Sequence, residues 1–150
     1  MSDRMVSGFA VRTGLAYDLD HHMWILMLDS GNARIGMDPL GLETCGTLAQ
    51  LAFAANAELA RGESFGSLEA EKFVGPLLAP LSGRVVAVNE AALMDPGLVE
   101  RDPYEAGWFI EIEPSSLDQE LGLLVREEAD ILEQFAEKIH QYRVEGVLAE

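Results

Sequence analysis

The chain has 150 residues, 49% of them hydrophobic and 24% charged, and its 10 basic and 26 acidic residues give a formal net charge of −16. A chain of this length most often forms one domain around one hydrophobic core. The negative charge argues against nucleic-acid binding, which needs clustered lysine and arginine, and against docking on anionic lipid, which attracts basic segments. We expect partner proteins to present basic surfaces.

The chain carries no recognisable targeting signal. Its first twenty residues, MSDRMVSGFAVRTGLAYDLD, lack the continuous apolar stretch of a signal peptide, and no run approaches the roughly 20 apolar residues of a membrane span. The single cysteine, Cys45, has no partner for an internal disulfide, which fits a reducing compartment. These features predict a cytoplasmic protein that does not contact membranes.

The first fifty residues predict strands joined by a turn. Residues 23–28 form a short apolar run, the turn sequence DSGN follows, and residues 33–37 alternate apolar with polar or small residues. Asp38 and Pro39 are typical of a helix N-cap and first helical position, so we expect a short helix over residues 39–44.

The middle of the chain predicts mainly strands and tight turns. The apolar stretch 47–53 fits a strand or a helix, and its periodicity does not decide between them. Residues 90–94 predict a short helix. Lys72 is expected at the apex of a hairpin, after which Gly-Pro sends the chain back. The expected strands are 65–71, 77–80, 84–88 and 108–113.

The last third of the chain predicts a helix instead of strands. From Leu117 to Tyr142 apolar residues recur at spacings of three and four, which predicts a helix interrupted near Gly122. Acidic residues lie between them. They form either a solvated outer face or a surface that recognises a partner.

An ordered set of motifs in residues 64–113 carries a family resemblance. The segment EAEK ends at Lys72, and APLSG (79–83), VVAVNE (85–90) and DPYEAGW (102–108) follow it. This order and spacing resemble the H protein of the glycine cleavage system, in which E-S-x-K, A-P-x-S-G, V-V-x-x-N-E and D-P-Y-x-x-G-W follow one another. The resemblance extends more loosely over residues 15–125.

The resemblance implies a cofactor, a fold and a division of the chain. In such proteins the matching lysine carries lipoic acid in amide linkage, so Lys72 is the expected attachment point, flanked by Glu69, Glu71 and Phe73. The implied fold is mainly β, a lipoyl-type β-sandwich (barrel-sandwich hybrid) with short peripheral helices and a C-terminal helix. The expected parts are an N-terminal extension (1–14), the carrier domain (15–115) and an acidic C-terminal helix packed on that domain (116–150).

Biotin is the alternative cofactor, since biotinyl carriers also use a lysine on a hairpin. Those domains place methionines on both sides of the lysine, whereas Lys72 lies between Glu71 and Phe73, which favours lipoate. Lys138 is the only other lysine, and it falls within the predicted C-terminal helix.

The resemblance also implies a carrier rather than an enzyme. A lipoate ligase or lipoyl transferase would attach the cofactor, and the arm would carry an aminomethyl group between glycine decarboxylase, aminomethyltransferase and dihydrolipoyl dehydrogenase. Two departures from the family pattern, Phe73 after the lysine and Met23 before Trp24, look closer to H-like proteins that carry sulfur intermediates for a heterodisulfide-reductase-like complex. A non-lipoylated regulatory relative is a further alternative, and a monomer is expected.

Metal and nucleophilic chemistry have little support in the sequence. His21 and His22 are adjacent, so on a strand they would point to opposite faces and would not share a metal ion. Serines lack an associated acid–base pattern, and Cys45 is expected to be a buried small hydrophobe. The residues expected in the core or at its edges are Trp24, Phe65, Leu68, Val86, Val88, Trp108, Phe109 and Ile112.

Overall fold

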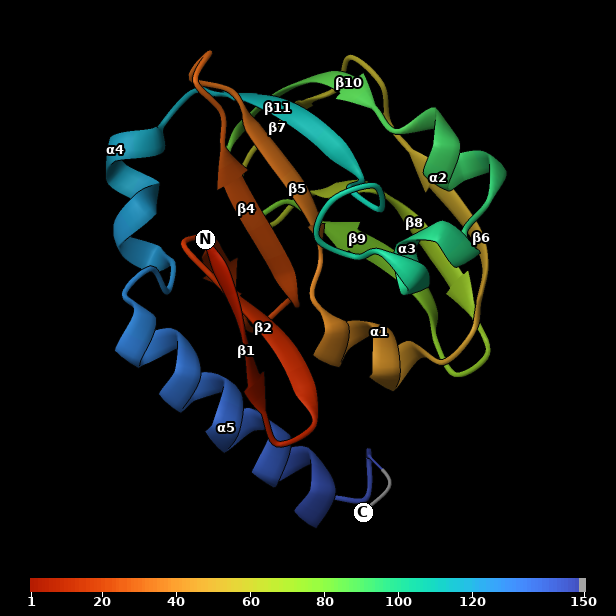
Figure 1. Cartoon of the computed structure of the whole chain (residues 1–150). Coiled ribbons are helices and arrows are strands. Elements are labelled where there is room, and N and C mark those ends of the chain that lie inside the picture. The colour runs from red at the N-terminus through yellow and green to blue at the C-terminus, as the bar shows by residue number, and fades with distance from the viewer. Residues whose placement is uncertain (149–150) are drawn as a thin grey trace.

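The computed structural model describes residues 1–148. Two antiparallel sheets pack face to face, and a long C-terminal helix lies along one side (Figure 1). The larger sheet has the order β3-β4-β5-β11-β10-β7, the smaller has the order β6-β8-β9, and a separate hairpin pairs β1 with β2. The strands are β1 (Ser2–Val6), β2 (Phe9–Thr13), β3 (Ala16–Asp18), β4 (Met23–Met27), β5 (Ala33–Met37), β6 (Leu48–Phe53), β7 (Glu58–Leu59), β8 (Ser64–Ala70), β9 (Val74–Leu78), β10 (Gly83–Val88) and β11 (Ile110–Pro114).

The helices are short except for the last. Two of them lie between β10 and β11, one follows β5, and the remaining ones follow β11. They are α1 (Pro39–Cys45), α2 (Glu90–Met94), α3 (Gly97–Arg101), α4 (Leu117–Glu120), the 3-10 turn η1 (Leu121–Leu123) and α5 (Glu128–Val144). The break near Gly122 that the sequence predicts is present, because η1 and an extended segment separate α4 from α5.

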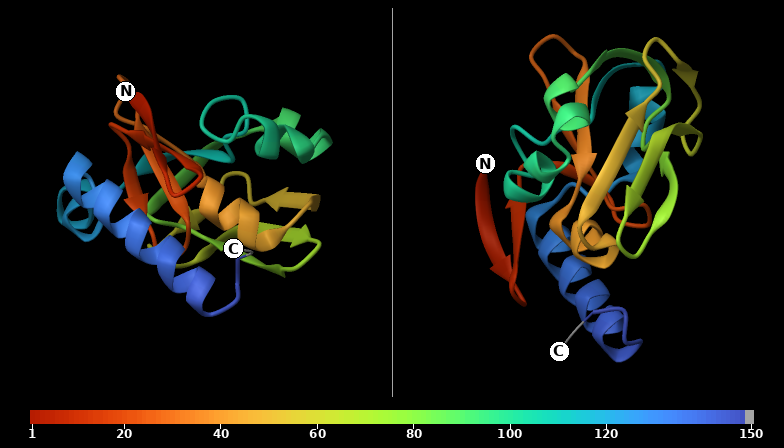
Figure 2. Two further views of the ribbon diagram at one scale, coloured as in Figure 1. Left: turned by 60° about the horizontal axis from the view of Figure 1, so that its bottom comes forward. Right: turned by 90° about the vertical axis from the view of Figure 1, so that its right-hand side faces the viewer.

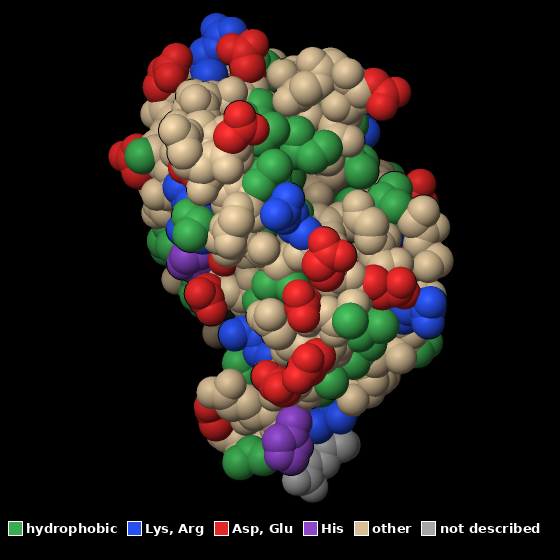
Figure 3. Space-filling view, turned by 90° about the vertical axis from the view of Figure 1, so that its left-hand side faces the viewer, with side chains coloured by type: hydrophobic (Ala, Val, Ile, Leu, Met, Phe, Trp, Pro, Cys, Tyr) green, Lys and Arg blue, Asp and Glu red, His purple; other side chains and the backbone are tan. Residues whose placement is uncertain are grey.

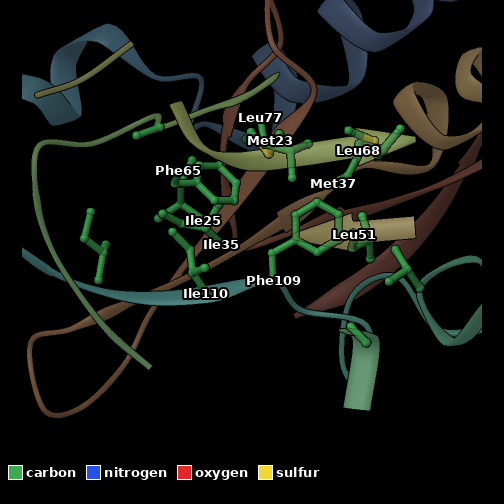
Figure 4. Close-up of a cluster of buried hydrophobic side chains, with 14 of the residues drawn as sticks. Met23, Ile25, Ile35, Met37, Leu51, Phe65, Leu68, Leu77, Phe109 and Ile110 are labelled. Carbon is green, nitrogen blue, oxygen red and sulfur yellow. The ribbon is translucent and has the colours of Figure 1, made fainter. Parts of the chain in front are cut away.

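The main core fills the space between the two sheets (Figure 4). The smaller sheet contributes Phe65 and Leu68, which are almost completely buried, and the larger sheet contributes Ile35. Phe109, just before β11, has its ring centroid 6.4 Å from that of Phe65. Burying a side chain of this size contributes about 1.5–3 kcal/mol, so these contacts hold the sheets together.

A second core lies on the outer side of the larger sheet, beneath β1, β2 and α5 (Figure 2). Tyr17 and Phe135 are fully buried there, with their rings edge-on and the centroids 5.1 Å apart. The indole N–H of Trp24 donates to the carbonyl of Pro103 at 3.0 Å. This core attaches the N-terminal hairpin and the C-terminal helix to the sandwich.

Most of the expected elements are present. The sequence did not predict the β1–β2 hairpin or the two-residue strand β7, and β11 begins at Ile110 instead of residue 108. β9 begins at Val74 instead of residue 77, because Pro76 can occupy an edge strand whose neighbour does not need its missing N–H. Val86 is 37% exposed, since Val85 beside it faces the core and successive strand residues face opposite sides. Residues 47–53 resolve as the strand β6.

Candidate functional site

Lys72 lies in the exposed turn of the β8–β9 hairpin, where the sequence predicts it. The ladder closes with Glu69 opposite Val74, and the N–H of Ala70 donates to the carbonyl of Phe73 at 2.8 Å. The turn is therefore tight, and it presents the lysine side chain to solvent.

Two backbone hydrogen bonds tie this turn to the end of α1. The N–H of Lys72 donates to the carbonyl of Cys45 at 2.8 Å, and the N–H of Glu71 donates to that of Thr47 at 3.0 Å. Gly46 lies between these acceptors with φ of 76°, and a Cβ there would lie 2.7 Å from the Glu71 Oε1 atom. The base of the lysine is thus held by main-chain contacts that leave its side chain free.

The sequence around α1 explains why this anchor is where it is. Pro39 occupies the first turn, and the Asp38 carboxylate accepts a hydrogen bond from the N–H of Gly41 at 2.8 Å. The helix ends where the N–H of Gly46 donates to the carbonyl of Leu42 at 3.2 Å. Both ends agree with the sequence prediction, and the C-terminal end meets the lysine turn.

Lys72 borders two hollows of different chemistry. The first has a volume of about 520 Å³, and its walls include the β1–β2 turn at Phe9 and the carboxylates of Glu43, Glu71 and Glu100. The second has a volume of about 380 Å³. Its largely apolar lining includes Met23, Met37, Cys45, Phe73, Pro76, Leu77 and Leu78.

The three predicted flanking residues lie in different surroundings. Glu71 lines the first hollow and Phe73 the second, whereas Glu69 lines neither and is exposed on β8. The Phe73 ring, 42% exposed, covers Gly75, where a Cβ would lie 2.7 Å from the ring. The lysine therefore has an acidic side chain towards one hollow and an aromatic one towards the other.

His21 and His22 also line the second hollow, which the sequence did not predict. The expectation that they lie on a strand and face opposite ways is wrong, because both lie in the turn between β3 and β4, and His22 has a φ of 61°. Their adjacency to the Met-Trp segment was visible in the sequence. Their approach to Lys72 depends on long-range packing, for which no local signal exists.

Cys45 is buried, as expected, and burial raises the pKa of its thiol. Cys45 also borders the second hollow and supplies the carbonyl that anchors Lys72, and no local pattern in the sequence predicts either contact. Within residues 1–148, no group of three or more histidine, cysteine, aspartate or glutamate side chains is arranged to hold a metal ion. No helix in the same range is long and apolar enough to cross a membrane.

The face that carries α4 and α5 shows scattered acidic side chains with fewer basic ones among them (Figure 3). Some of these charges are paired: Arg4 lies 2.9 Å from the Glu128 carboxylate, with both side chains at least half exposed. Exposed pairs of this kind contribute little to stability. The surface thus remains predominantly negative, in agreement with the composition.

Two antiparallel sheets that enclose a common core define the chain as a lipoyl-type β-sandwich, and Lys72 lies on a protruding hairpin of it. The crystal structure of a glycine cleavage system H protein from Mycobacterium marinum has the same arrangement, with a TM-score of 0.70 and 31% sequence identity. The likeness covers 83% of this chain and 98% of that one.

The sequence comparisons agree. The model of the family "Glycine cleavage H-protein" matches residues 15–137. A probable glycine cleavage system H protein of Thermococcus gammatolerans is 36% identical over 125 residues, which are 83% of this chain and 92% of the relative. The H protein of a Picosynechococcus species is 39% identical over 104 residues, 69% of this chain and 78% of the relative. The chain belongs to the glycine cleavage H-protein family, whose members are carriers rather than enzymes.

Proposed function

We propose that the protein is a lipoyl carrier, with lipoate in amide linkage to the side-chain nitrogen of Lys72. The observation that carries this proposal is the exposed lysine on a tight turn whose backbone is anchored at 2.8 Å and 3.0 Å to the end of α1, in a chain of this family. A swinging arm needs an exposed side chain on an anchored base, and the exposed Lys72 with its hydrogen-bonded backbone supports this role.

The residues around Lys72 fit such a group. The bound cofactor would supply a disulfide that accepts and releases cargo by thiol chemistry. The second hollow offers an apolar surface, and a long aliphatic chain gains free energy when it leaves water to pack against such a surface. Once Lys72 is acylated its positive charge is gone, so Glu69 and Glu71 leave this end of the molecule anionic.

The proposed cargo is the aminomethyl group of glycine cleavage. Glycine decarboxylase would load it, aminomethyltransferase would remove it, and dihydrolipoyl dehydrogenase would reoxidise the arm. A lipoate ligase or lipoyl transferase would first attach the cofactor. Family membership supports this set of partners. We further propose that residues 15–115 are the carrier domain, to which residues 1–14 and 116–150 are additions.

A second cargo has one observation in its favour. Met23, Met37, Cys45 and Phe73 line the second hollow, which makes that wall apolar and rich in sulfur. A charged amine gains little from such a surface, whereas an uncharged sulfur cargo loses little there. A carrier of sulfur intermediates for a heterodisulfide-reductase-like complex is therefore the alternative.

A mass measurement separates the two cargoes. The lipoylated protein is incubated with glycine and glycine decarboxylase in one reaction, and in another it is reduced and incubated with a low-molecular-weight persulfide donor. We expect a stable mass increase of one aminomethyl group in the first reaction and none that survives gel filtration in the second. Stable loading only by the sulfur donor would replace the proposed function with the alternative, and the Lys72→Arg variant should show neither increase.

A further inference from the structure

Two histidines border the second hollow, and each is backed by a buried carboxylate. His21 Nδ1 lies 2.9 Å from Asp18 Oδ2, and His22 Nδ1 lies 3.3 Å from Asp38 Oδ2. The side chains of Asp18 and Asp38 are 3% and 0% exposed. Lys72 lines the same hollow. Two carboxylate-backed imidazoles therefore adjoin the site from which the lipoyl arm would extend.

The two rings differ in what their second nitrogen meets. A carboxylate at Nδ1 keeps the proton of a neutral imidazole on that atom and leaves a lone pair on Nε2. In His22 that lone pair is occupied, because Nε2 lies 2.7 Å from the hydroxyl of Tyr142 on α5. For His21, no hydrogen bond within residues 1–148 engages Nε2, and the side chain is 37% exposed. Only His21 is thus free to exchange a proton with a group in the hollow.

The Asp18 carboxylate has a second partner. Arg61, from the turn before β8, places Nη2 3.8 Å from Asp18 Oδ2. If the only role of His21 were to donate a hydrogen bond to the buried Asp18 carboxylate, its Nδ1–H would be sufficient. The remaining nitrogen, held at the edge of an apolar hollow beside Lys72, is the feature that a purely structural role leaves unexplained.

We propose that His21, positioned by Asp18, exchanges a proton with the thiols of the reduced lipoyl arm on Lys72. This inference rests on the proposed function. The proton leaves a sulfur atom and binds Nε2 of His21, which forms a thiolate and an imidazolium and transfers no electron. A neighbouring imidazolium stabilises a thiolate, so the arm would be more nucleophilic at neutral pH than a free dithiol.

Other ionisable groups around the hollow bear on this exchange. Asp20 lies on the same turn and lines the same hollow, and acylated Lys72 contributes no charge. Cys45 keeps its proton because burial raises its pKa. The remaining groups lie behind the two histidines: Asp18, Asp38, Arg61 and Tyr142.

The first test measures how fast iodoacetamide alkylates the reduced arm between pH 6 and 10. It uses protein of equal lipoylation, verified by intact mass, and free dihydrolipoamide as the reference. His21→Asn is the informative variant, because its amide can still donate to Asp18 but cannot take up a proton. We expect the variant to react more slowly at pH 7, on the order of tenfold, which corresponds to one unit in the thiol pKa.

His140→Asn is the matched control, because His140 lies exposed on α5 and lines neither of the two hollows. It should leave the pH profile unchanged. Identical profiles for the wild type and His21→Asn would overturn the inference while leaving the carrier function intact. A protein that gains no lipoyl mass at all would instead overturn the proposed function, so the two failures are distinguishable.

A second readout does not depend on the arm's reactivity. The imidazole signals of His21 are titrated by NMR in the lipoylated protein with its arm oxidised and with its arm reduced, so that the two samples carry the same charge at position 72. We expect the midpoint of the His21 titration to move upward when the reduced arm is present, because a thiolate nearby favours the imidazolium. His140 should titrate identically in both samples. An unchanged His21 midpoint would contradict proton exchange between the two groups.

Discussion

The Lys72 turn and the face formed by β1, β2 and α5 are stabilised by different interactions. The turn depends on main-chain hydrogen bonds to Cys45 and Thr47, and its own side chains are exposed. The face formed by β1, β2 and α5 depends instead on packed side chains, and Tyr17 and Phe135 are fully buried there. Main-chain anchoring is almost independent of the side chains it carries, whereas a packed core depends on their shape.

This difference separates function from stability. Side-chain changes in the turn should alter what the arm does while the protein stays folded. Changes in the buried face should alter stability while the arm site, in the protein that remains folded, keeps its geometry. Substitutions in each region test that separation.

Removing the Phe135 ring should destabilise the protein most. Phe135→Ala deletes a fully buried side chain whose ring packs edge-on against Tyr17. We expect a loss of about 3–5 kcal/mol in the free energy of unfolding, measured by urea denaturation. The folded fraction should still accept lipoate at the wild-type rate per folded molecule. A proportionate loss in that rate would mean that the two regions are coupled.

High pH should weaken the same face. Burial raises the pKa of Tyr17 and of Tyr104 above the ordinary tyrosine value, so the folded state keeps these protons longer than the unfolded state. The free energy of unfolding should therefore be unaffected by these two groups below about pH 10 and should fall above it, by up to about 1.4 kcal/mol per pH unit for each tyrosine. Urea denaturation between pH 9 and 11 measures the slope.

The Tyr17→Phe variant provides the control for that slope. It keeps the ring packing and removes one ionisable group, so its stability should decline less steeply with pH than that of the wild type. An unchanged slope would show that the alkaline loss arises elsewhere in the chain.

Substituting Gly46 should lower both the stability of the protein and the rate at which Lys72 is lipoylated. Gly31 is the matched control. Both glycines have positive φ, 76° and 92°, so either change to alanine should cost about 1 kcal/mol in stability. Only at Gly46 would the new Cβ meet the lysine turn, 2.7 Å from Glu71 Oε1. Gly46→Ala should slow lipoylation of Lys72, and Gly31→Ala should not. Equal lipoylation rates in the two variants would rule out a role for the anchor.

Neutralising the acidic neighbours of the lysine should have the smallest effect. Both Glu69 and Glu71 are exposed, so the double change to glutamine should leave stability within about 0.5 kcal/mol of the wild type. It should raise the apparent KM of a partner enzyme for the lipoylated carrier on the order of twofold, and the effect should vanish at high salt. If the partner enzyme's rate with the lipoylated carrier changed neither with salt nor with these substitutions, the acidic surface would serve solubility alone.

How much the sequence predicts depends on the range of the interactions involved. Asp38 and Pro39 mark the start of α1 because helix capping is local, and the ordered motifs around Lys72 identify the hairpin. The N-terminal hairpin was missed although Ser7 and Gly8, both with positive φ, supply a turn between its strands. The exposed, polar β1 lacks the alternation that indicates a strand.

The hollows beside Lys72 could not be predicted from local patterns. The second one brings together the turn before β4, the end of α1 and β9, three segments far apart in the sequence. The positive φ of His22 turns the chain there and removes both histidines from the strand geometry that adjacent residues would otherwise imply. The wall of the first hollow at Phe9 likewise depends on the hairpin's attachment to the second core.

The most direct test of the central claim is the intact mass of the protein after incubation with a lipoate ligase, lipoate and ATP. The chain has two lysines, and Lys138 is half-buried on α5 with its ammonium 5.6 Å from the centre of the Tyr142 ring. We expect an increase of one lipoyl group in the wild type and in Lys138→Arg, and none in Lys72→Arg. An increase that survives Lys72→Arg and disappears in Lys138→Arg would contradict the assignment of Lys72 as the attachment site.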